Sequence, residues 1–190
     1  MTSMPPAAPK GVRKEAMAKT REALIDAGLR LAERTGLAGL SVNLIVQEAG
    51  VAKGTFFHHF GDRASYLLAL HREFHERLAT QIQAAIDGMP PGRRRLTCVA
   101  HTYLDGCLRD RGVRALLLEA RAEPAVTDEI ARRNHASAEL CEADFVALKR
   151  PHPYESAQLW VGMAAEAALI EHQAGKALPA VRNALEQFLD

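Results

Sequence analysis

Residues 41–60 read SVNLIVQEAGVAKGTFFHHF, and this stretch decides the fold. Ser41 is placed to cap a short helix, because its side-chain oxygen can accept an early backbone N–H. Gly50 can adopt the positive φ of a sharp turn, and Ala49 is small enough to let two helices approach closely. A second short helix is predicted at about residues 52–59. Two short helices joined by such a turn are typical of a helix-turn-helix, whose second helix enters the DNA major groove.

The helical period sorts the side chains of this second helix into two faces. Phe56 and Phe60 are four residues apart and are predicted to face inward, with Val51 beside them. Lys53 and Phe57, also four apart, are predicted to share an outward face. An outward face with a lysine, an aromatic ring and neighbouring imidazoles indicates a surface that meets nucleic acid.

Each outward group suits one kind of DNA contact. Lys53, early in the helix, can donate to guanine O6 and N7, and Phe57 can contact a thymine methyl. Thr55 and His59 can donate to phosphate oxygens, while Gly54 permits close approach of the backbone. The predicted DNA-binding residues are Ser41, Lys53, Gly54, Thr55, Phe57, His58, His59 and Arg63. An ordinary helical hairpin with solvated lysine and histidines is the alternative that the residues alone leave open.

Outside this stretch the chain also reads as helix, because apolar residues recur at helical spacing and strand-like alternation is absent. We predict an all-α protein of about nine helices. A compact three-helix head is expected to join a larger helical body through a long helix at about residues 65–86. Residues 1–14 are predicted to form a flexible basic arm, whose Lys10, Arg13 and Lys14 could follow the minor groove.

Composition limits the classes of function. The chain has 190 residues, of which 48% are hydrophobic and 25% charged, and this suits a soluble protein with a substantial core. No apolar run approaches the roughly 18 residues of a membrane span, and the first residues lack a signal-peptide pattern. We therefore expect a cytoplasmic location and no membrane partner. Residues 1–72 carry ten basic against six acidic side chains, which is compatible with one end meeting a polyanion.

The stretch from Arg21 to Leu68 resembles the DNA-binding domain of the TetR (tetracycline repressor) family of transcriptional regulators. The residues that carry the resemblance are Arg21, Leu24, Ile25, Ala27, Leu31, Gly36, Ser41, Val42, the run Ala49–Thr55, His59, Phe60, Arg63 and Leu67. The chain departs from the family pattern at Gly28 and Val46, where alanine is common. It departs again at Phe57, where the family usually has a tyrosine hydroxyl that can reach phosphate.

The resemblance implies a helix-turn-helix DNA-binding domain at residues 15–62 and a regulatory domain for ligand binding and dimerisation at 63–190. It implies a homodimer in which each head reads one half-site of a palindromic DNA operator. It also implies a repressor that an unidentified small-molecule effector releases from that operator. In this family Thr55, His59 and Arg63 fall at positions that commonly contact phosphate.

The body is expected to hold the ligand cavity and the dimer interface. The predicted ligand-binding residues are Phe74, Leu78, Tyr103, Cys107, Leu118, Arg121, Trp160, Met163 and Glu166. Arg121 and Glu166 stand at core-like positions, where a charge needs a partner. The predicted interface residues, on helices at about 154–173 and 180–189, are Ala157, Val161, Ala164, Ala165, Ala168, Leu169, Val181, Leu185 and Phe188. Their small side chains permit close helix packing, either with a second copy or within one chain.

Other chemistries find less support in the sequence. His71 with His75, and Cys98 with His101, have a spacing that suits a metal, but no third ligand follows at a clear spacing. The three cysteines form no CxxC pattern. We therefore predict no metal, no cofactor and no enzyme, since no Ser-His-Asp, paired-carboxylate or phosphate-loop motif is present. A helical protein-binding adaptor and a histidine- or metal-dependent enzyme are the alternative functions.

Overall fold

The computed structural model of the chain describes residues 10–35, 40–110 and 124–190. Every regular element within these ranges is a helix, which confirms the predicted all-α class. The helices are α1 (Lys10–Thr35), α2 (Val42–Ala49), α3 (Lys53–Phe60), α4 (Arg63–Ile86), α5 (Arg93–Arg109), α7 (Pro124–Ala147), α8 (Pro153–Ala174) and α9 (Pro179–Gln187). The described ranges thus contain eight helices, against about nine predicted for the chain.

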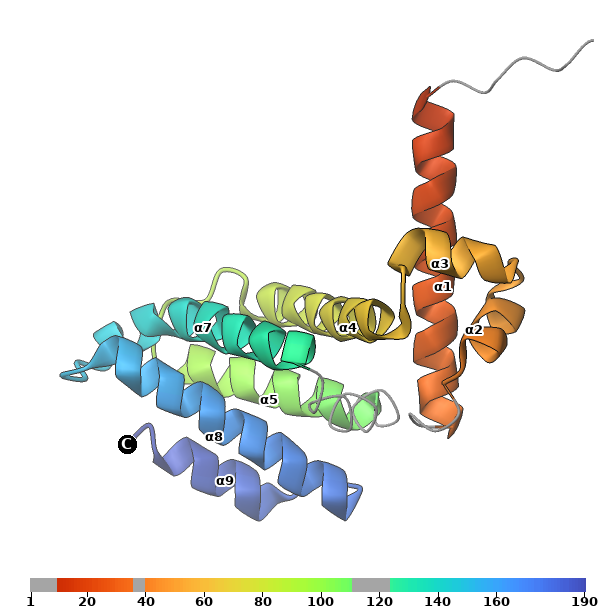
Figure 1. The fold of residues 1–190 in the computed structure, drawn as a ribbon. Helices are drawn as coiled ribbons and strands as arrows, with labels where there is room; N and C mark the ends of the chain where they lie inside the picture. Colours follow the sequence, from red (N-terminus) through yellow and green to blue (C-terminus); the bar gives the residue numbers. More distant parts are fainter. Residues whose placement is uncertain (1–9, 36–39, 111–123) are drawn as a thin grey trace, which may run out of the picture.

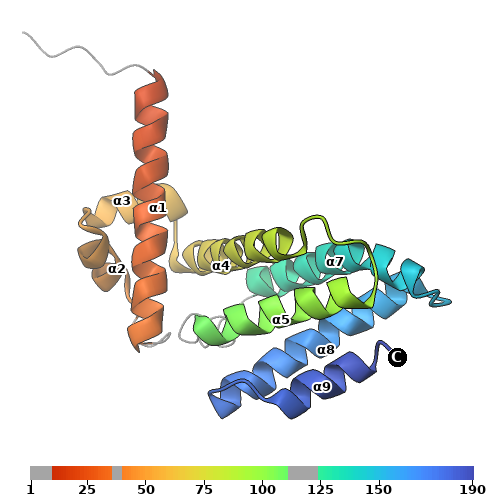
Figure 2. The ribbon, with the colours of Figure 1, turned by 180° about the vertical axis from the view of Figure 1, so that it is seen from behind.

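Three helices form a head and the others form a body (Figure 1). In the head, α2 lies on the side of α1 that points away from the body, and α3 crosses α1. The long helix predicted at about residues 65–86 is α4, which leaves the head and runs into the body. There α5 and α7 pack against it, α8 packs on α7 and α5, and α9 lies along α8 at the outer edge (Figure 2).

Local sequence signals set the ends of two of these helices. Asp62 caps α4 by accepting a hydrogen bond from the Ser65 backbone N–H at 2.7 Å, so the helix begins slightly earlier than predicted. α1 begins at Lys10, although residues 10–14 were assigned to the flexible arm. Glutamate, alanine and lysine just after that point are strong helix formers, and they extend α1 toward its N-terminus. Residues 1–9 of the arm lie outside the described ranges.

The core of the head is a cluster of aromatic rings. Phe56 and Phe60 of α3 pack on Tyr66 of α4, with ring centroids 4.9 and 4.8 Å from that of the tyrosine. Tyr66 is fully buried, and its hydroxyl donates to the Leu24 carbonyl oxygen of α1 at 2.7 Å. A Cβ at Gly28 would lie 2.0 Å from that hydroxyl oxygen. The glycine that departs from the family pattern is therefore required by the tyrosine packed against it.

Ion pairs connect the head to the body and the body helices to one another. Arg77 of α4 donates to Asp26 of α1 at 2.6 Å and to Glu73 of its own helix at 2.8 Å. In the body, the fully buried Asp144 of α7 accepts from Arg95 of α5 at 2.7 Å. Removing one partner of a buried pair leaves an uncompensated charge in the core, so this pair holds α5 and α7 in register.

Candidate nucleic-acid interface and ligand cavity

The turn between α2 and α3 has the geometry that the sequence predicts. The Ser41 hydroxyl accepts a hydrogen bond from the Leu44 backbone N–H at 3.3 Å and so caps α2. Gly50 has a φ of 68°, and its N–H donates to the Val46 and Gln47 carbonyl groups at the end of α2. Because glycine adopts this conformation without steric cost, the chain can turn sharply into α3.

α3 buries one face and presents the other to solvent. Phe56 and Phe60 are 0% and 8% exposed, which confirms the prediction that they face inward. Lys53 is exposed and Phe57 keeps 44% of its surface exposed, which confirms the predicted outward face. An apolar ring held in water on a cationic face is a feature that a binding partner would cover.

The other predicted DNA-binding residues surround this face. Those that are exposed are Ser41, Gly54, His58 and Arg63, and those that are half-buried are Thr55 and His59. Together with Lys53 and Phe57 these eight residues are called the α3 surface below. In both ribbon views α3 stands clear of α5, α7, α8 and α9, so the body does not cover this surface.

The protonation state of His59 limits what it can do at this surface. Burial lowers the pKa of His59, and the neighbouring His58 and Arg21 side chains lower it further. The imidazole is therefore neutral near pH 7 and can donate one N–H to a phosphate oxygen. Within the described ranges, no group of three or more His, Cys, Asp or Glu side chains is arranged to hold a metal ion.

Ion pairs hold α2 against α1 and so hold in place the turn that leads from α2 into α3. Glu48 of α2 accepts hydrogen bonds from Arg34 at 2.8 Å and from Arg30 at 3.1 Å, both on α1. Both hydrogen bonds lower the pKa of Glu48, and the one from Arg34 has the larger effect. The carboxylate therefore stays ionised and keeps both contacts across the pH range in which the protein would meet DNA.

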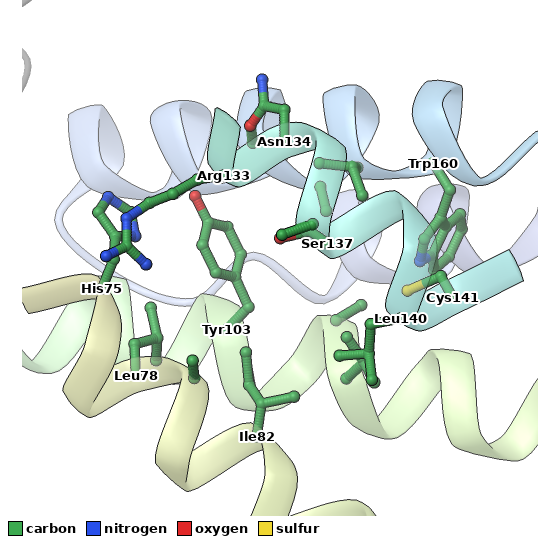
Figure 3. A pocket seen from close by; sticks show the side chains of 17 residues that line it. His75, Leu78, Ile82, Tyr103, Arg133, Asn134, Ser137, Leu140, Cys141 and Trp160 are labelled. Atoms are coloured by element: carbon green, nitrogen blue, oxygen red, sulfur yellow. The ribbon is translucent and has the colours of Figure 1, made fainter. Parts of the chain in front are cut away.

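A cavity of about 220 Å³ lies inside the body between α4, α5, α7 and α8 (Figure 3). Leu78, Tyr103 and Trp160, which the sequence predicted as ligand-binding residues, line this cavity. Other lining residues were not predicted, among them His75, Ile82, Val99, Arg133, Asn134, Ser137, Leu140 and Cys141. Helical spacing offered one signal for His75, which lies one turn before a predicted lining residue on α4.

The remaining predicted ligand-binding residues lie elsewhere. Phe74 and Cys107 are buried in the core, and Met163 is half-buried, but none of the three lines this cavity. Glu166 is exposed on the outer side of α8, so water solvates its charge and no buried partner is needed. Leu118 and Arg121 fall outside the described residues.

Most of the predicted dimer-interface residues on α8 and α9 pack inward. Those buried in the core of their own chain are Ala157, Ala164, Ala168 and Leu185. Val161 and Val181 are half-buried against this core, and Ala165 and Leu169 are half-buried. The buried members of the small-residue stripe of α8 pack within the chain, where α8 contacts α7 and α5. Phe188 alone of the predicted set is largely exposed, at 63%. The opposite face of α8 carries exposed apolar residues that were not predicted, Leu159 and Ile170.

None of the helices in the described part of the chain combines the length and the hydropathy needed to cross a membrane.

Comparison with known proteins assigns the head to a family. The sequence model of "Bacterial regulatory proteins, tetR family" matches residues 24–70. The transcriptional regulator AcuR of Cereibacter sphaeroides is 32% identical over 124 residues, or 57% of each chain. The HTH-type transcriptional regulator BetI of Vibrio vulnificus is 35% identical over 70 residues, or 37% of this chain and 35% of BetI. The chain thus spans about a third to three fifths of the length of these curated relatives.

Solved structures with the same fold cover nearly the whole chain. A TetR transcription regulator from Haloarcula marismortui has a TM-score of 0.79 at 16% identity, covering 91% of this chain and 97% of that one. The multidrug binding protein EbrR, solved in complex with imidazole, has a TM-score of 0.72 at 24% identity, covering 90% and 94%. At these identities the likeness establishes the fold of head and body together.

Proposed function

We propose that this chain, a member of the tetR family of bacterial regulatory proteins, binds a palindromic operator in double-stranded DNA as a homodimer and represses transcription until a small molecule releases it. The observation that carries this proposal is the α3 surface, which lies on a tightly packed helix and is left uncovered by the body. A second helix of a helix-turn-helix that is exposed in this way is positioned to enter a major groove.

The residues of the α3 surface divide into those that read bases and those that position the protein. Lys53, in the first turn of α3, is the base-reading residue, because it can donate to guanine O6 and N7. The Phe57 ring adds apolar contact with a thymine methyl. Thr55, the neutral His59 and Arg63 donate to phosphates and set the register of the helix in the groove.

A second copy of the chain would cover the exposed apolar face of α8 and α9. Leu159 of α8 is 70% exposed and Phe188 beside the end of α9 is 63% exposed, and both are costly to leave in water. A two-fold axis at this face would pair α8 and α9 with their copies and place one α3 surface on each side. The two surfaces could then reach successive major grooves, which lie about 34–36 Å apart.

α4 provides the connection between a bound ligand and the head. On one face its His75, Leu78 and Ile82 line the cavity, and on another its Arg77 holds Asp26 of α1. A ligand that favours one position of α4 would therefore also favour one position of the head. Only a ligand that binds the DNA-bound and free arrangements unequally can release the operator in this way.

Selection of bound DNA from a random pool by the purified protein tests the proposal. A palindromic consensus supports a dimeric DNA reader, and recovery of no consensus counts against one. On that consensus, Lys53→Ala should lose about 1–3 kcal/mol of preference at one base pair of each half-site. Lys176→Ala, which removes the same charge from the exposed turn between α8 and α9, is the matched control and should leave the preference unchanged.

A further inference from the structure

The cavity in the body has one polar end and one apolar end (Figure 3). His75 of α4, Tyr103 of α5 and Arg133 of α7 lie together at the polar end, with the tyrosine hydroxyl on the side of the arginine. Leu140, Cys141 and Trp160 lie at the other end, away from the charged groups. A molecule that fills this space would need a polar head group and an apolar body.

The polar end carries more positive than negative charge. Glu129 of α7 is buried and accepts hydrogen bonds from Arg72 of α4 at 2.8 Å and from Arg132, while Arg133 lies 3.3 Å away. Glu76 is 3.8 Å from Arg133 but largely exposed, so water screens its charge. Arg132 is exposed as well, so water screens its charge in the same way, and among the described residues Arg72 and Arg133 then share the one buried carboxylate of Glu129. The head group that fits this end is therefore an anion.

Arg133 is the member of this cluster that faces the cavity. Its side chain is 22% exposed and lines the cavity, whereas that of Arg132 is 61% exposed and does not. Burial lowers the pKa of Arg133 in spite of the nearby Glu129. The planar guanidinium group favours a planar anion, because two N–H groups can meet the two oxygens of one carboxylate.

The volume of the cavity limits the size of the apolar part. A cavity of about 150 Å³ is known to hold benzene. The remaining space of a 220 Å³ cavity is enough for a carboxylate and a short linker. We infer that this cavity binds a small monocarboxylate with an apolar ring, of the size of 3-phenylpropanoate, whose carboxylate meets Arg133 and Tyr103. As a regulatory site the cavity rests on the proposed function, but as a binding site it can be tested without DNA.

Isothermal titration of the full-length protein with 3-phenylpropanoate is the first test. Its neutral isostere 3-phenylpropanamide and its cationic analogue 3-phenylpropylamine are titrated in parallel. The acid should bind at least about tenfold more tightly than the amide, since a charge-assisted pair with arginine is lost, and the amine should not bind measurably. Equal affinity for the acid and the amide, or tighter binding of the amine, would overturn the inference.

Two arginine variants locate the anion. Arg133→Met approximately keeps the length of the side chain and removes its charge. It should reduce the affinity for the acid by about tenfold and leave the affinity for the amide unchanged. Arg132→Met is the matched control, because this neighbour also contacts Glu129 but does not line the cavity. An equal loss of affinity for the acid in both variants would mean that the two arginines affect binding only by stabilising the fold, and it would count against a direct contact with Arg133. If Arg133→Met fails to fold, Arg133→Lys keeps the charge but lacks the planar fork, and it should bind the acid more weakly than the wild-type protein does.

The outcomes separate this inference from the proposed function. A palindromic DNA consensus together with equal affinity for the acid and the amide would refute the carboxylate site and would still support the proposed DNA binding. Tight, Arg133-dependent binding of the acid without any DNA consensus supports the site and refutes the regulator. The DNA selection and the titrations are separate measurements on the same full-length protein. Neither result therefore depends on the outcome of the other.

Discussion

Replacing Gly28 by alanine tests how the head is packed. The added Cβ would lie 2.0 Å from the Tyr66 hydroxyl oxygen, 2.9 Å from its Cζ and 3.0 Å from Leu70 Cδ2. These separations are below van der Waals contact, and the tyrosine ring is fully buried, so it cannot move without displacing its neighbours. Any movement also breaks the 2.7 Å hydrogen bond from the hydroxyl to the Leu24 carbonyl oxygen.

The size of the effect follows from three contributions. Overpacking a core typically costs about 1–3 kcal/mol. A buried hydroxyl that loses its partner costs about 1–3 kcal/mol more. Alanine recovers about 1 kcal/mol through its higher helix propensity. We expect Gly28→Ala to reduce the free energy of unfolding by about 3 kcal/mol, which in a chain of this length lowers Tm by about 6–12 °C.

Thermal unfolding followed by far-UV circular dichroism measures this change. Gly54→Ala is the control, because a Cβ there meets nothing within 4 Å, and its stability should stay within about 1 kcal/mol of the wild type. In the double variant with Tyr66→Phe the closest contact disappears. Its destabilisation should therefore fall short of the sum of the single changes by about 1 kcal/mol or more. A Gly28→Ala protein that melts like the wild type, or single changes that simply add, would refute the packing argument.

Three further predictions concern the ion pair between head and body, the proposed dimer interface, and the buried carboxylate that joins α8 to α9. Arg77→Met, which breaks the contact with Asp26, should cost less than about 1 kcal/mol of stability but reduce ligand-induced release of DNA, measured by fluorescence anisotropy of labelled operator. Leu159→Glu should shift the protein from dimer toward monomer in sedimentation velocity, because it places a charge in the proposed interface. Burial would raise the pKa of Glu171, but hydrogen bonds from Arg182 and a backbone N–H hold it below its ordinary value of 4.5. Its stabilisation is therefore present above pH 4.5 and lost as pH falls through the lowered pKa, so Glu171→Gln should melt lower at pH 7 and respond less to acid.

The head could be predicted from the sequence because its signals are local. The cap at Ser41, the positive φ at Gly50 and the inward turn of Phe56 each depend on residues within one or two helical turns. The requirement for Gly28 could not be predicted in the same way. It arises from Tyr66, which is 38 positions further along the chain and meets the glycine only after α4 has packed on α1.

Sites in the body are harder to predict from the sequence, because they depend on how distant helices pack. The alanine stripe that includes Ala164 has helical spacing, and this spacing is the same whether the stripe faces a second copy or the chain's own core. Arg133 sits in a run of charged and polar residues on α7 that reads as a solvated face. Its place at the cavity follows from the packing of α7 over α4 and α5, which no pattern within α7 reveals.

Close packing along α4 explains how a small cavity could influence the head at all. Leu78 lines the cavity, and on the α5 side a Cβ at Gly106 would lie 2.4 Å from its Cδ1, so the two helices touch there with no space to spare. On this side a ligand that pushes on Leu78 meets no free space, although Leu78 also borders a second hollow beside Arg77 and Gln81. A push that this hollow does not absorb would pass to α4, which carries both Tyr66 in the head core and Arg77 on Asp26 of α1. Under the proposed function, the tight contact at Gly106 would favour a movement of α4 over a local adjustment of Leu78, because a looser contact would absorb the push at the side chain.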